Sequence, residues 1–160
     1  MTLTIRWARP GDEPEVLRLV RGLAAYERAP DAVQTTEAML AETLFGDTPQ
    51  VFAFLAELDG RVVGLALWFL TYSTWTGRPS LYLEDLFVDE SARGRGIARA
   101  LMRRLAKETK ARDCARMDWA VLDWNVDAMA FYDRLGAGRQ TGWEPWRLQG
   151  AALDALAGEQ

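Results

Sequence analysis

A strand that runs into a glycine-rich turn and then into a helix is the feature that most restricts how this chain can fold. The segment 81–89, Leu-Tyr-Leu-Glu-Asp-Leu-Phe-Val-Asp, leads into Arg93-Gly-Arg-Gly-Ile-Ala98. Glycine lets a backbone approach an anion closely, and the helix that follows offers unpaired N–H groups and the positive end of its dipole. The turn therefore predicts a site for a pyrophosphate. It lacks the Gly-x-Gly-x-x-Gly of a nicotinamide domain and the Lys-Ser/Thr pair of a P-loop, which disfavours dinucleotides and nucleoside triphosphates.

Hydrophobic periodicity and turn signals predict the surrounding elements in the order β-α-α-β-β-β-α-β-α-β. Asp12 is expected to cap the first helix, Asp59-Gly60 to form a two-residue hairpin, and Gly136 to end the last helix. Strands are expected at 3–7, 51–58, 61–72, 81–88, 115–122 and 143–149, and helices from residue 12 to before residue 30, at 36–45, from 97 to 110 and at 125–135. This order predicts an α/β fold in which helices cover a mixed sheet, within one domain spanning residues 1–160.

Two adjacent carboxylates, Glu84 and Asp85, interrupt the apolar strand before the turn. Strict alternation predicts that they point to opposite faces, Glu84 with Tyr82, Leu86 and Val88, and Asp85 with Leu81, Leu83 and Phe87. Such carboxylates are costly inside a strand unless each has water, a partner or a task. Both are candidate functional residues, and solvated carboxylates on a partly exposed strand are the alternative.

The composition excludes several kinds of site. The chain has no histidine, so a general base must be a carboxylate or water, and most zinc sites are ruled out. Cys114 is the only cysteine, which excludes an intrachain disulfide and favours a reducing cytoplasm. The longest apolar stretch, 62–70, is too short to span a bilayer, and no N-terminal leader pattern precedes it. We therefore expect a soluble, cytoplasmic protein that does not enter membranes.

The charge distribution gives a weaker indication of the partner. A net charge of −4 argues against nucleic acid and is compatible with a cationic substrate. The basic residues of the helix from 97 to 110 are expected to form a solvated face: Arg99, Arg103, Arg104, Lys107 and Lys110.

Several segments together resemble the GNAT superfamily of N-acetyltransferases, whose acetyl-CoA motif is Arg/Gln-x-x-Gly-x-Gly/Ala after a strand. The matching residues run from Arg93 to Ala98. Within that superfamily the chain is similar to the diamine acetyltransferase (spermidine/spermine N1-acetyltransferase) branch, through Thr71-Tyr-Ser-Thr-Trp75, Tyr82-Leu-Glu-Asp85, Ala120-Val-Leu-Asp-Trp-Asn125 and Phe131-Tyr132 followed by Leu135-Gly-Ala137. The resemblance implies the GNAT fold, a mixed and mostly antiparallel sheet flanked by helices. In that fold the strands after Tyr82 and after Ala115 splay apart to form the acetyl-CoA cleft.

The resemblance also implies which residues bind acetyl-CoA, with no metal required. The backbone amides of Gly94 to Ala98 would hold the pyrophosphate. The full implied set lies on the strand before the turn, around the turn and at the start of a later helix: Leu86, Phe87, Val88, Arg93, Gly94, Arg95, Gly96, Ile97, Ala98, Arg99, Asn125, Val126, Asp127 and Ala128. From its sequence position alone, Asn125 is equally an ordinary helix N-cap.

Two residues are implied to be catalytic. Tyr132 matches the family's general acid, and a phenol with a pKa near ~10 can hand a proton to a departing thiolate. Glu84 is the candidate base, acting through water, because an alkylammonium group with a pKa of ~10.4 cannot attack until it loses a proton. A structural hydrogen bond for Tyr132 and simple electrostatic binding of the cation by Glu84 are the alternatives.

The implied acceptor site is a carboxylate-rich groove with aromatic walls, which suits ammonium groups. Its residues are Tyr26, Glu27, Ser73, Trp75, Glu84, Asp85, Asp118, Trp119, Ala120 and Glu144, among which Glu27 and Glu144 could equally be surface charges. Ser73 stands where the polyamine-specific members carry an aspartate for the distal ammonium. This departure favours the members that acetylate thialysine and related lysine-like amino acids.

The sequence therefore predicts an acetyl-CoA-dependent N-acetyltransferase that acetylates a small primary amine by direct attack. We expect a thialysine-like or lysine-like amino acid ahead of a diamine or polyamine, and the resemblance implies a homodimer. Transfer to a protein lysine or an aminoglycoside, and a non-catalytic acetyl-CoA sensor, are the alternatives.

Overall fold

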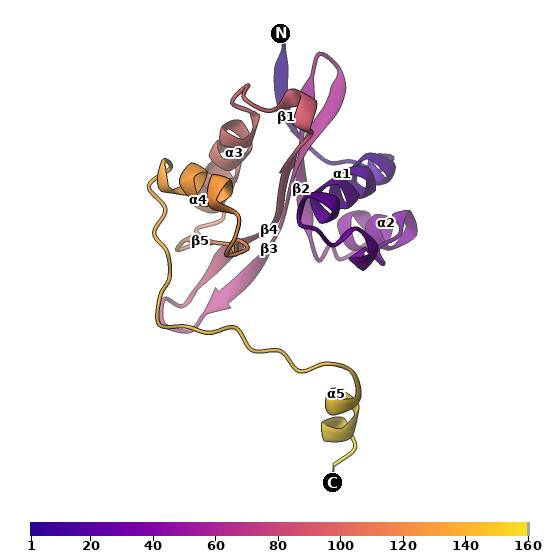
Figure 1. Ribbon diagram of the computed structural model, residues 1–160, viewed down its shortest axis with the longest axis vertical. Coiled ribbons are helices and arrows are strands. Elements are labelled where there is room, and N and C mark those ends of the chain that lie inside the picture. Colours follow the sequence, from indigo (N-terminus) through magenta and orange to yellow (C-terminus); the bar gives the residue numbers. More distant parts are fainter. Residues whose placement is uncertain (160) are drawn as a thin grey trace. The chain divides into compact units, whose positions relative to one another are not determined.

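The computed structural model describes residues 1–159, and the chain divides into two compact units, residues 1–122 and the residues from Asp123 onward (Figure 1). The elements of the first unit are β1 (Leu3–Trp7), α1 (Glu13–Tyr26), the 3-10 helix η1 (Pro30–Ala32), α2 (Glu37–Phe45), β2 (Phe52–Leu58), β3 (Arg61–Ser73), β4 (Arg78–Val88), the 3-10 helix η2 (Glu90–Ala92), α3 (Ile97–Ala111) and β5 (Met117–Asp118). The second unit contains α4 (Val126–Asp133) and α5 (Gly150–Ala157).

The first unit is built on a five-stranded mixed sheet in the order β1-β2-β3-β4-β5. The pairs β1–β2, β2–β3 and β3–β4 are antiparallel, and the pair β4–β5 is parallel. As expected, Asp59 and Gly60 form the tight connection between β2 and β3, with φ angles of 50° and 82°. Both residues are therefore in the left-handed region that a twisted two-residue hairpin requires.

β5 is much shorter than the strand predicted at 115–122. It pairs with β4 only through Leu81↔Met117 and Tyr82↔Asp118. Beyond Tyr82, no strand among the described residues pairs with this edge of β4. The expected divergence of the two strands after Tyr82 is therefore present.

A β-bulge at Glu84 overturns the strict alternation predicted for β4. Adjacent residues of β3, Leu67 and Trp68, pair with Asp85 and Leu83, so Glu84 is an extra residue in β4. A bulge shifts the residues that follow it by one position relative to the two faces. Asp85 and Phe87 therefore share a face with Tyr82, whereas Leu86 and Val88 share the other face with Leu81 and Leu83.

Helices cover both faces of the sheet, α1 and α2 on one side and α3 on the other (Figure 1). The core under α1 and α2 is aliphatic apart from one ring; its buried residues are Val16, Leu17, Leu19, Leu40, Leu44, Ala53, Leu55, Leu65, Leu67 and Phe87. Because Leu65 and Leu67 pair with Phe87 and Asp85, the side chain of Asp85 lies on the α1 face.

The face covered by α3 is aromatic and includes cations. Arg104 lies 4.4 Å from the ring centre of Phe54, and Arg112 lies 4.8 Å from that of Phe52. Both arginines pair with the buried Glu108, at 3.2 Å and 2.8 Å. The prediction that Arg104 belongs to a solvated basic face is therefore wrong, because spacing along a helix does not show which aromatic rings the sheet presents to it. Arg99, Arg103, Lys107 and Lys110 are exposed, as expected.

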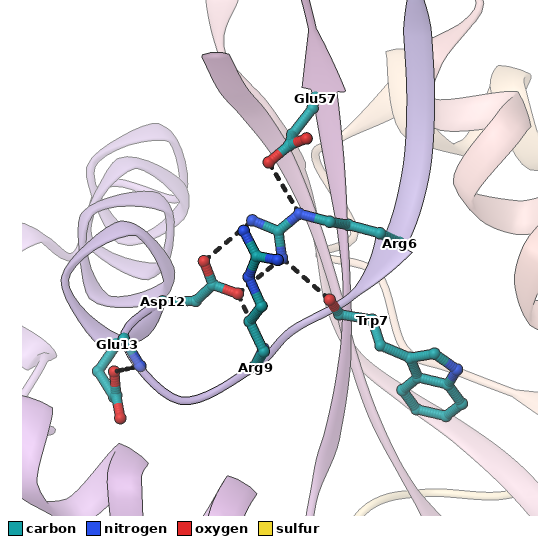
Figure 2. A network of polar contacts seen from close by, with 7 residues as sticks. Arg6, Trp7, Arg9, Asp12, Glu13 and Glu57 are labelled. Atoms are coloured by element: carbon teal, nitrogen blue, oxygen red, sulfur yellow. Dashed lines mark hydrogen bonds and ion pairs between the residues drawn. The ribbon is translucent and has the colours of Figure 1, made fainter. Parts of the chain in front are cut away.

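A polar network ties the start of α1 to the sheet (Figure 2). The Arg6 guanidinium donates to both carboxylate oxygens of Asp12, at 2.7 Å and 2.9 Å, and its Nε donates to Glu57 on β2 at 2.8 Å. The hydrogen bond from Arg6 holds the pKa of Asp12 below its usual value. Asp12 stands at the N-cap position but its side chain does not cap α1, contrary to prediction; it accepts from Arg6 and from the Arg9 N–H instead.

The second unit departs most from prediction. α4 begins after Asn125 as expected but ends at Asp133, two residues before the predicted end at 135, with the left-handed Gly136 following. No strand forms at 143–149 in the described chain, since Pro145 lacks the N–H that a ladder needs and no neighbouring strand in this unit pairs with the segment. The alanine- and leucine-rich stretch that follows forms α5, which was not predicted.

Candidate active site

The glycine-rich turn precedes α3 as the sequence predicts. Gly94 and Gly96 have φ angles of 74° and 75°, and Gly96 is the N-cap of α3. A Cβ built on either glycine would meet no atom within 4 Å, and residues 93–96 are exposed. The turn therefore has open space around its glycines and precedes a 15-residue helix, which fits the binding of a pyrophosphate. Ile97, in contrast, is buried and anchors the helix to the sheet.

The strand that leads into this turn offers unpaired backbone on its outer edge. Leu86, Phe87 and Val88 pair with β3 on one side, through Ala66, Leu65 and Gly64, and no described strand pairs with the other side. Phe87 and Val88 are buried, so their side chains hold the strand in place. An extended ligand could therefore add to this edge by backbone hydrogen bonds, as a further strand would.

Three carboxylates gather near the middle of β4 and the end of α1. Burial, then the charge of Glu84 and that of Glu27, raises the pKa of Asp85 to about 6. Burial and the charge of Glu84 also raise the pKa of Glu27, and burial with the charges of Glu84 and Asp118 raises that of Tyr82. These shifts place the groups within electrostatic reach of one another. The negative field so created favours a cation.

The other predicted acceptor residues of the first unit are more dispersed. Asp118 pairs with Arg116 at 2.8 Å, which offsets part of its charge, and Trp119 and Ala120 follow it where β5 ends. Ser73 pairs with Arg78 at the hairpin end of β3 and β4, and Trp75 in that hairpin is 88% exposed. Arg78 and Glu84 are six positions apart along β4, roughly 20 Å at the usual rise, so the structure does not bring Ser73 to the carboxylates.

The second unit carries the remaining predicted residues. The Asn125 side chain accepts from the Ala128 N–H at 3.2 Å, and α4 then begins with Val126 and Asp127. Asn125 is therefore a helix N-cap. Tyr132 lies in the last turn of α4, with its ring centre 5.3 Å from that of Phe131. Glu144 is exposed in the irregular segment between α4 and α5.

Two arrangements at the site were not predicted. The Arg93 guanidinium stacks over the rings of Tyr26 and Phe87, at 5.0 Å and 5.7 Å from their centres. Gly22 of α1 approaches Phe87 so closely that an added Cβ would lie 2.7 Å from the ring. A glycine inside an amphipathic helix was the only sequence signal for this approach.

Two features are absent from residues 1–159. No group of three or more His, Cys, Asp or Glu side chains is arranged to hold a metal ion. No helix there is long and apolar enough to cross a membrane.

The sequence model of the acetyltransferase (GNAT) family matches residues 17–137, which include the carboxylates, the turn, Asn125 and Tyr132. The chain belongs to this family. It is an N-acetyltransferase, and GNAT acetyltransferases use acetyl-CoA. The resemblance inferred from the turn and its flanking motifs is confirmed.

Relatives and solved structures agree with this assignment. The chain is 39% identical to thialysine N-epsilon-acetyltransferase of Bos taurus over 97% of each chain. It is 35% identical to human spermidine/spermine N(1)-acetyltransferase-like protein 1, covering 98% of this chain and 24% of that protein. An integron cassette protein from the mobile metagenome of V. cholerae superposes with a TM-score of 0.83 at 28% identity, over 99% of both chains.

Proposed function

We propose that this acetyltransferase transfers the acetyl group of acetyl-CoA to the primary amine of a small cationic acceptor. A thialysine-like or lysine-like amino acid is preferred over a diamine or polyamine. The observation that supports this most strongly is the group formed by Glu27, Glu84 and Asp85 on the same unit as the exposed glycine turn. One unit thus carries a site for an anion and a site for a cation.

The chain holds acetyl-CoA by its backbone more than by its side chains in this proposal. The N–H groups from Gly94 to Ala98 bind the pyrophosphate, and the open edge of β4 from Leu83 to Val88 pairs with the amide groups of the pantetheine arm. The exposed Arg95 and Arg99 add positive charge around the phosphates. At the start of α4, the segment from Asn125 to Ala128 supplies further coenzyme contacts, as the family resemblance implies.

Chemistry begins with the acceptor, which arrives as an ammonium ion. Glu84 removes its proton through a water molecule, and Asp85 and Glu27 hold the cation before that step. The neutral amine nitrogen then attacks the thioester carbonyl carbon, a C–N bond forms, and the C–S bond breaks. Tyr132 donates its proton to the departing thiolate and is reprotonated by the surplus proton of the newly acylated nitrogen, so no covalent acetyl-enzyme is needed.

The acceptor preference rests first on the relatives and second on residue 73. Ser73 lies roughly 20 Å along the strand from Glu84, so its missing charge concerns only the distal ammonium of a long polyamine. A lysine-like amino acid needs only one side-chain amine to be bound as a cation. The relatives that align over nearly their whole length include one named for thialysine. Ser73→Asp is expected to raise kcat/KM for spermidine relative to thialysine, and an unchanged ratio would remove residue 73 from the account.

The protein is further proposed to act in the cytoplasm as a homodimer, without nucleic acid or membrane partners. The support for a dimer is the exposure of large apolar side chains in the second unit, chiefly Trp143 and Trp146, which are 75% and 92% exposed. Large apolar side chains exposed this close together in sequence would fit an interaction surface if they form one patch. Light scattering across a concentration series tests this proposal, and a monomer at every concentration would contradict it.

Steady-state kinetics of two variants test the proposed chemistry. Tyr132→Phe should leave the Kd for CoA unchanged and reduce kcat by about 100-fold or more, the effect expected for a lost general acid. Glu84→Gln should reduce kcat/KM most at neutral pH, and less at high pH where free amine is abundant. Equal turnover in the phenylalanine variant would remove Tyr132 from the mechanism. Coenzyme binding without turnover of any acceptor by the wild type would favour a sensor.

A further inference from the structure

The Arg93 side chain makes contacts that coenzyme binding does not require. Its Nε donates to the Val88 carbonyl at 3.1 Å, and its guanidinium lies over the rings of Tyr26 and Phe87. Arg93 is the residue immediately before Gly94, where the anion-binding turn begins. One side chain therefore joins the turn, the end of β4 and the last residue of α1.

The geometry of α1 makes this junction specific. Gly22 and Tyr26 are four residues apart, so they lie on the same face of the helix. The absence of a side chain at Gly22 lets that face approach Phe87, and Tyr26 then extends one turn further, to the guanidinium of Arg93. The Phe87 ring thus lies next to both α1 and Arg93.

A second contact fixes α1 to the segment before the turn. Arg18 donates to both carboxylate oxygens of Asp89, at 3.0 Å and 3.1 Å, and to the Val62 carbonyl at 2.9 Å. Asp89 is the N-cap residue of η2. The segment from Asp89 to Arg93 is therefore held against α1 at two points, and only the one at Arg93 reaches the end that carries Glu27.

We propose that Arg93 is a positioning residue that couples occupation of the anion-binding turn to the placement of Tyr26 and Glu27 in the amine site. Ordering of the turn by a bound pyrophosphate restrains the Arg93 backbone, and its side chain passes that restraint to the end of α1. Glu27 then faces Glu84 and Asp85 in the position that binds a cation. Coenzyme binding is expected to strengthen amine binding, and by linkage the amine strengthens coenzyme binding equally. This inference rests on the proposed function for the identity of the amine.

Hydrogen exchange provides a test that does not depend on turnover. The probe is CoA alone, and the measured quantity is the amide exchange rate of residues 23–29 with and without it. In the wild-type protein, CoA should slow this exchange by about 3-fold or more. In Arg93→Met, which keeps an unbranched apolar side chain but loses the charge and the N–H donors, CoA should bind yet leave that exchange unchanged. Arg93→Lys, which keeps the charge over the rings, should recover part of the effect.

Kinetic and binding constants complete the test. The loss of an exposed cation–π contact and one hydrogen bond corresponds to a weakening of binding by about 5-fold or more. The KM for the amine, measured at saturating acetyl-CoA, should therefore rise by that factor in Arg93→Met, and it should rise by more than the Kd for CoA does. Arg103→Met is the matched control, because Arg103 is exposed on α3, and it should match the wild type.

Three outcomes would overturn the proposal. A higher Kd for CoA with an unchanged amine KM would make Arg93 a direct coenzyme ligand. Equal exchange protection in Arg93→Met and the wild type would show that α1 is restrained by other contacts. An absence of CoA-dependent protection at 23–29 in the wild type would show that the turn and α1 are independent. If no small amine is acetylated, the proposed function fails, and the exchange experiment still decides the role of Arg93.

Discussion

Asp85→Asn should stabilise this protein, because the aspartate is held in a place that disfavours its charge. Burial beside Glu84 and Glu27 raises its pKa from 3.8 to about 6. One pKa unit corresponds to about 1.4 kcal/mol, so a shift of about two units costs the folded state up to ~3 kcal/mol once the carboxylate is ionised. Asparagine has nearly the same shape and carries no charge. The variant should therefore regain most of this free energy of unfolding at pH 8.

The direction of the pH dependence follows from proton binding. Between pH 4 and 6 the folded state holds the Asp85 proton more tightly than the unfolded state does. Its contribution to the free energy of unfolding therefore falls as the pH rises through this window. The difference between Asp85→Asn and the wild type should be largest at pH 8 and should nearly vanish near pH 4.

Urea unfolding followed by tryptophan fluorescence at pH 4.5, 6 and 8 measures this difference. Asp47→Asn is the control, since Asp47 is exposed, and its effect should stay within about 0.5 kcal/mol at every pH. If Asp85→Asn is less stable than the wild type at pH 8, or if the difference in their free energies of unfolding does not depend on pH, the charge of Asp85 does not destabilise the folded state. The same substitution should raise the KM for the amine, because the charge that destabilises the fold is the charge proposed to bind the cation.

Three further substitutions test the packing around the site. Glu108→Gln removes the charge shared by two arginines on the aromatic face and should lower the free energy of unfolding by about 2 kcal/mol in urea titrations; no loss would show that the ion pairs are dispensable. Gly22→Ala should lower the free energy of unfolding by about 1–3 kcal/mol, because its methyl group would overlap the Phe87 ring, and this cost exceeds the gain of about 1 kcal/mol that alanine brings to a helix. The thermal midpoint should fall accordingly, and a higher midpoint would contradict the close approach. Asp12→Asn breaks the ion pair with Arg6, which lowers the pKa of Asp12 in the folded state. The variant should therefore be less stable than the wild type at pH 7, and this difference should disappear as the pH falls below 3.8. A difference that persists in acid would show that packing, not the ion pair, is responsible.

Local signals predicted the parts of the fold that depend on neighbouring residues. Asp59 and Gly60 adopt the left-handed conformations that their hairpin implies, and Gly94 and Gly96 form the turn that opens α3. These features were predictable because the backbone conformation of a tight turn is set by the residues within it. The order of the strands along the chain, up to β5, was predicted from the same local signals.

Features that depend on contacts between distant residues could not be predicted. The bulge at Glu84 reflects pairing with β3, so its effect on the direction of Asp85 was invisible to a rule based on alternation. The stacking of Arg93 on Tyr26 joins residues 67 positions apart, which no local pattern reports. The segment 143–149 has the composition of a strand, but no strand of its own unit pairs with it. The alternation of residues within a segment does not show whether a pairing strand is present.

A panel of acceptors shows which amine the enzyme acetylates. Purified protein is incubated with acetyl-CoA and, separately, with thialysine, lysine, ornithine, putrescine, spermidine or spermine, and both CoA release and product mass are measured. We expect the enzyme to add one acetyl group to the side-chain amine of thialysine or a lysine-like amino acid and to release one CoA for each product molecule. The polyamines should react more slowly than these amino acids. Acetylated spermidine or spermine as the leading product would contradict the role given to Ser73. Coenzyme binding with no acetylated product from any of the six amines would contradict the assignment of a small-amine acceptor itself.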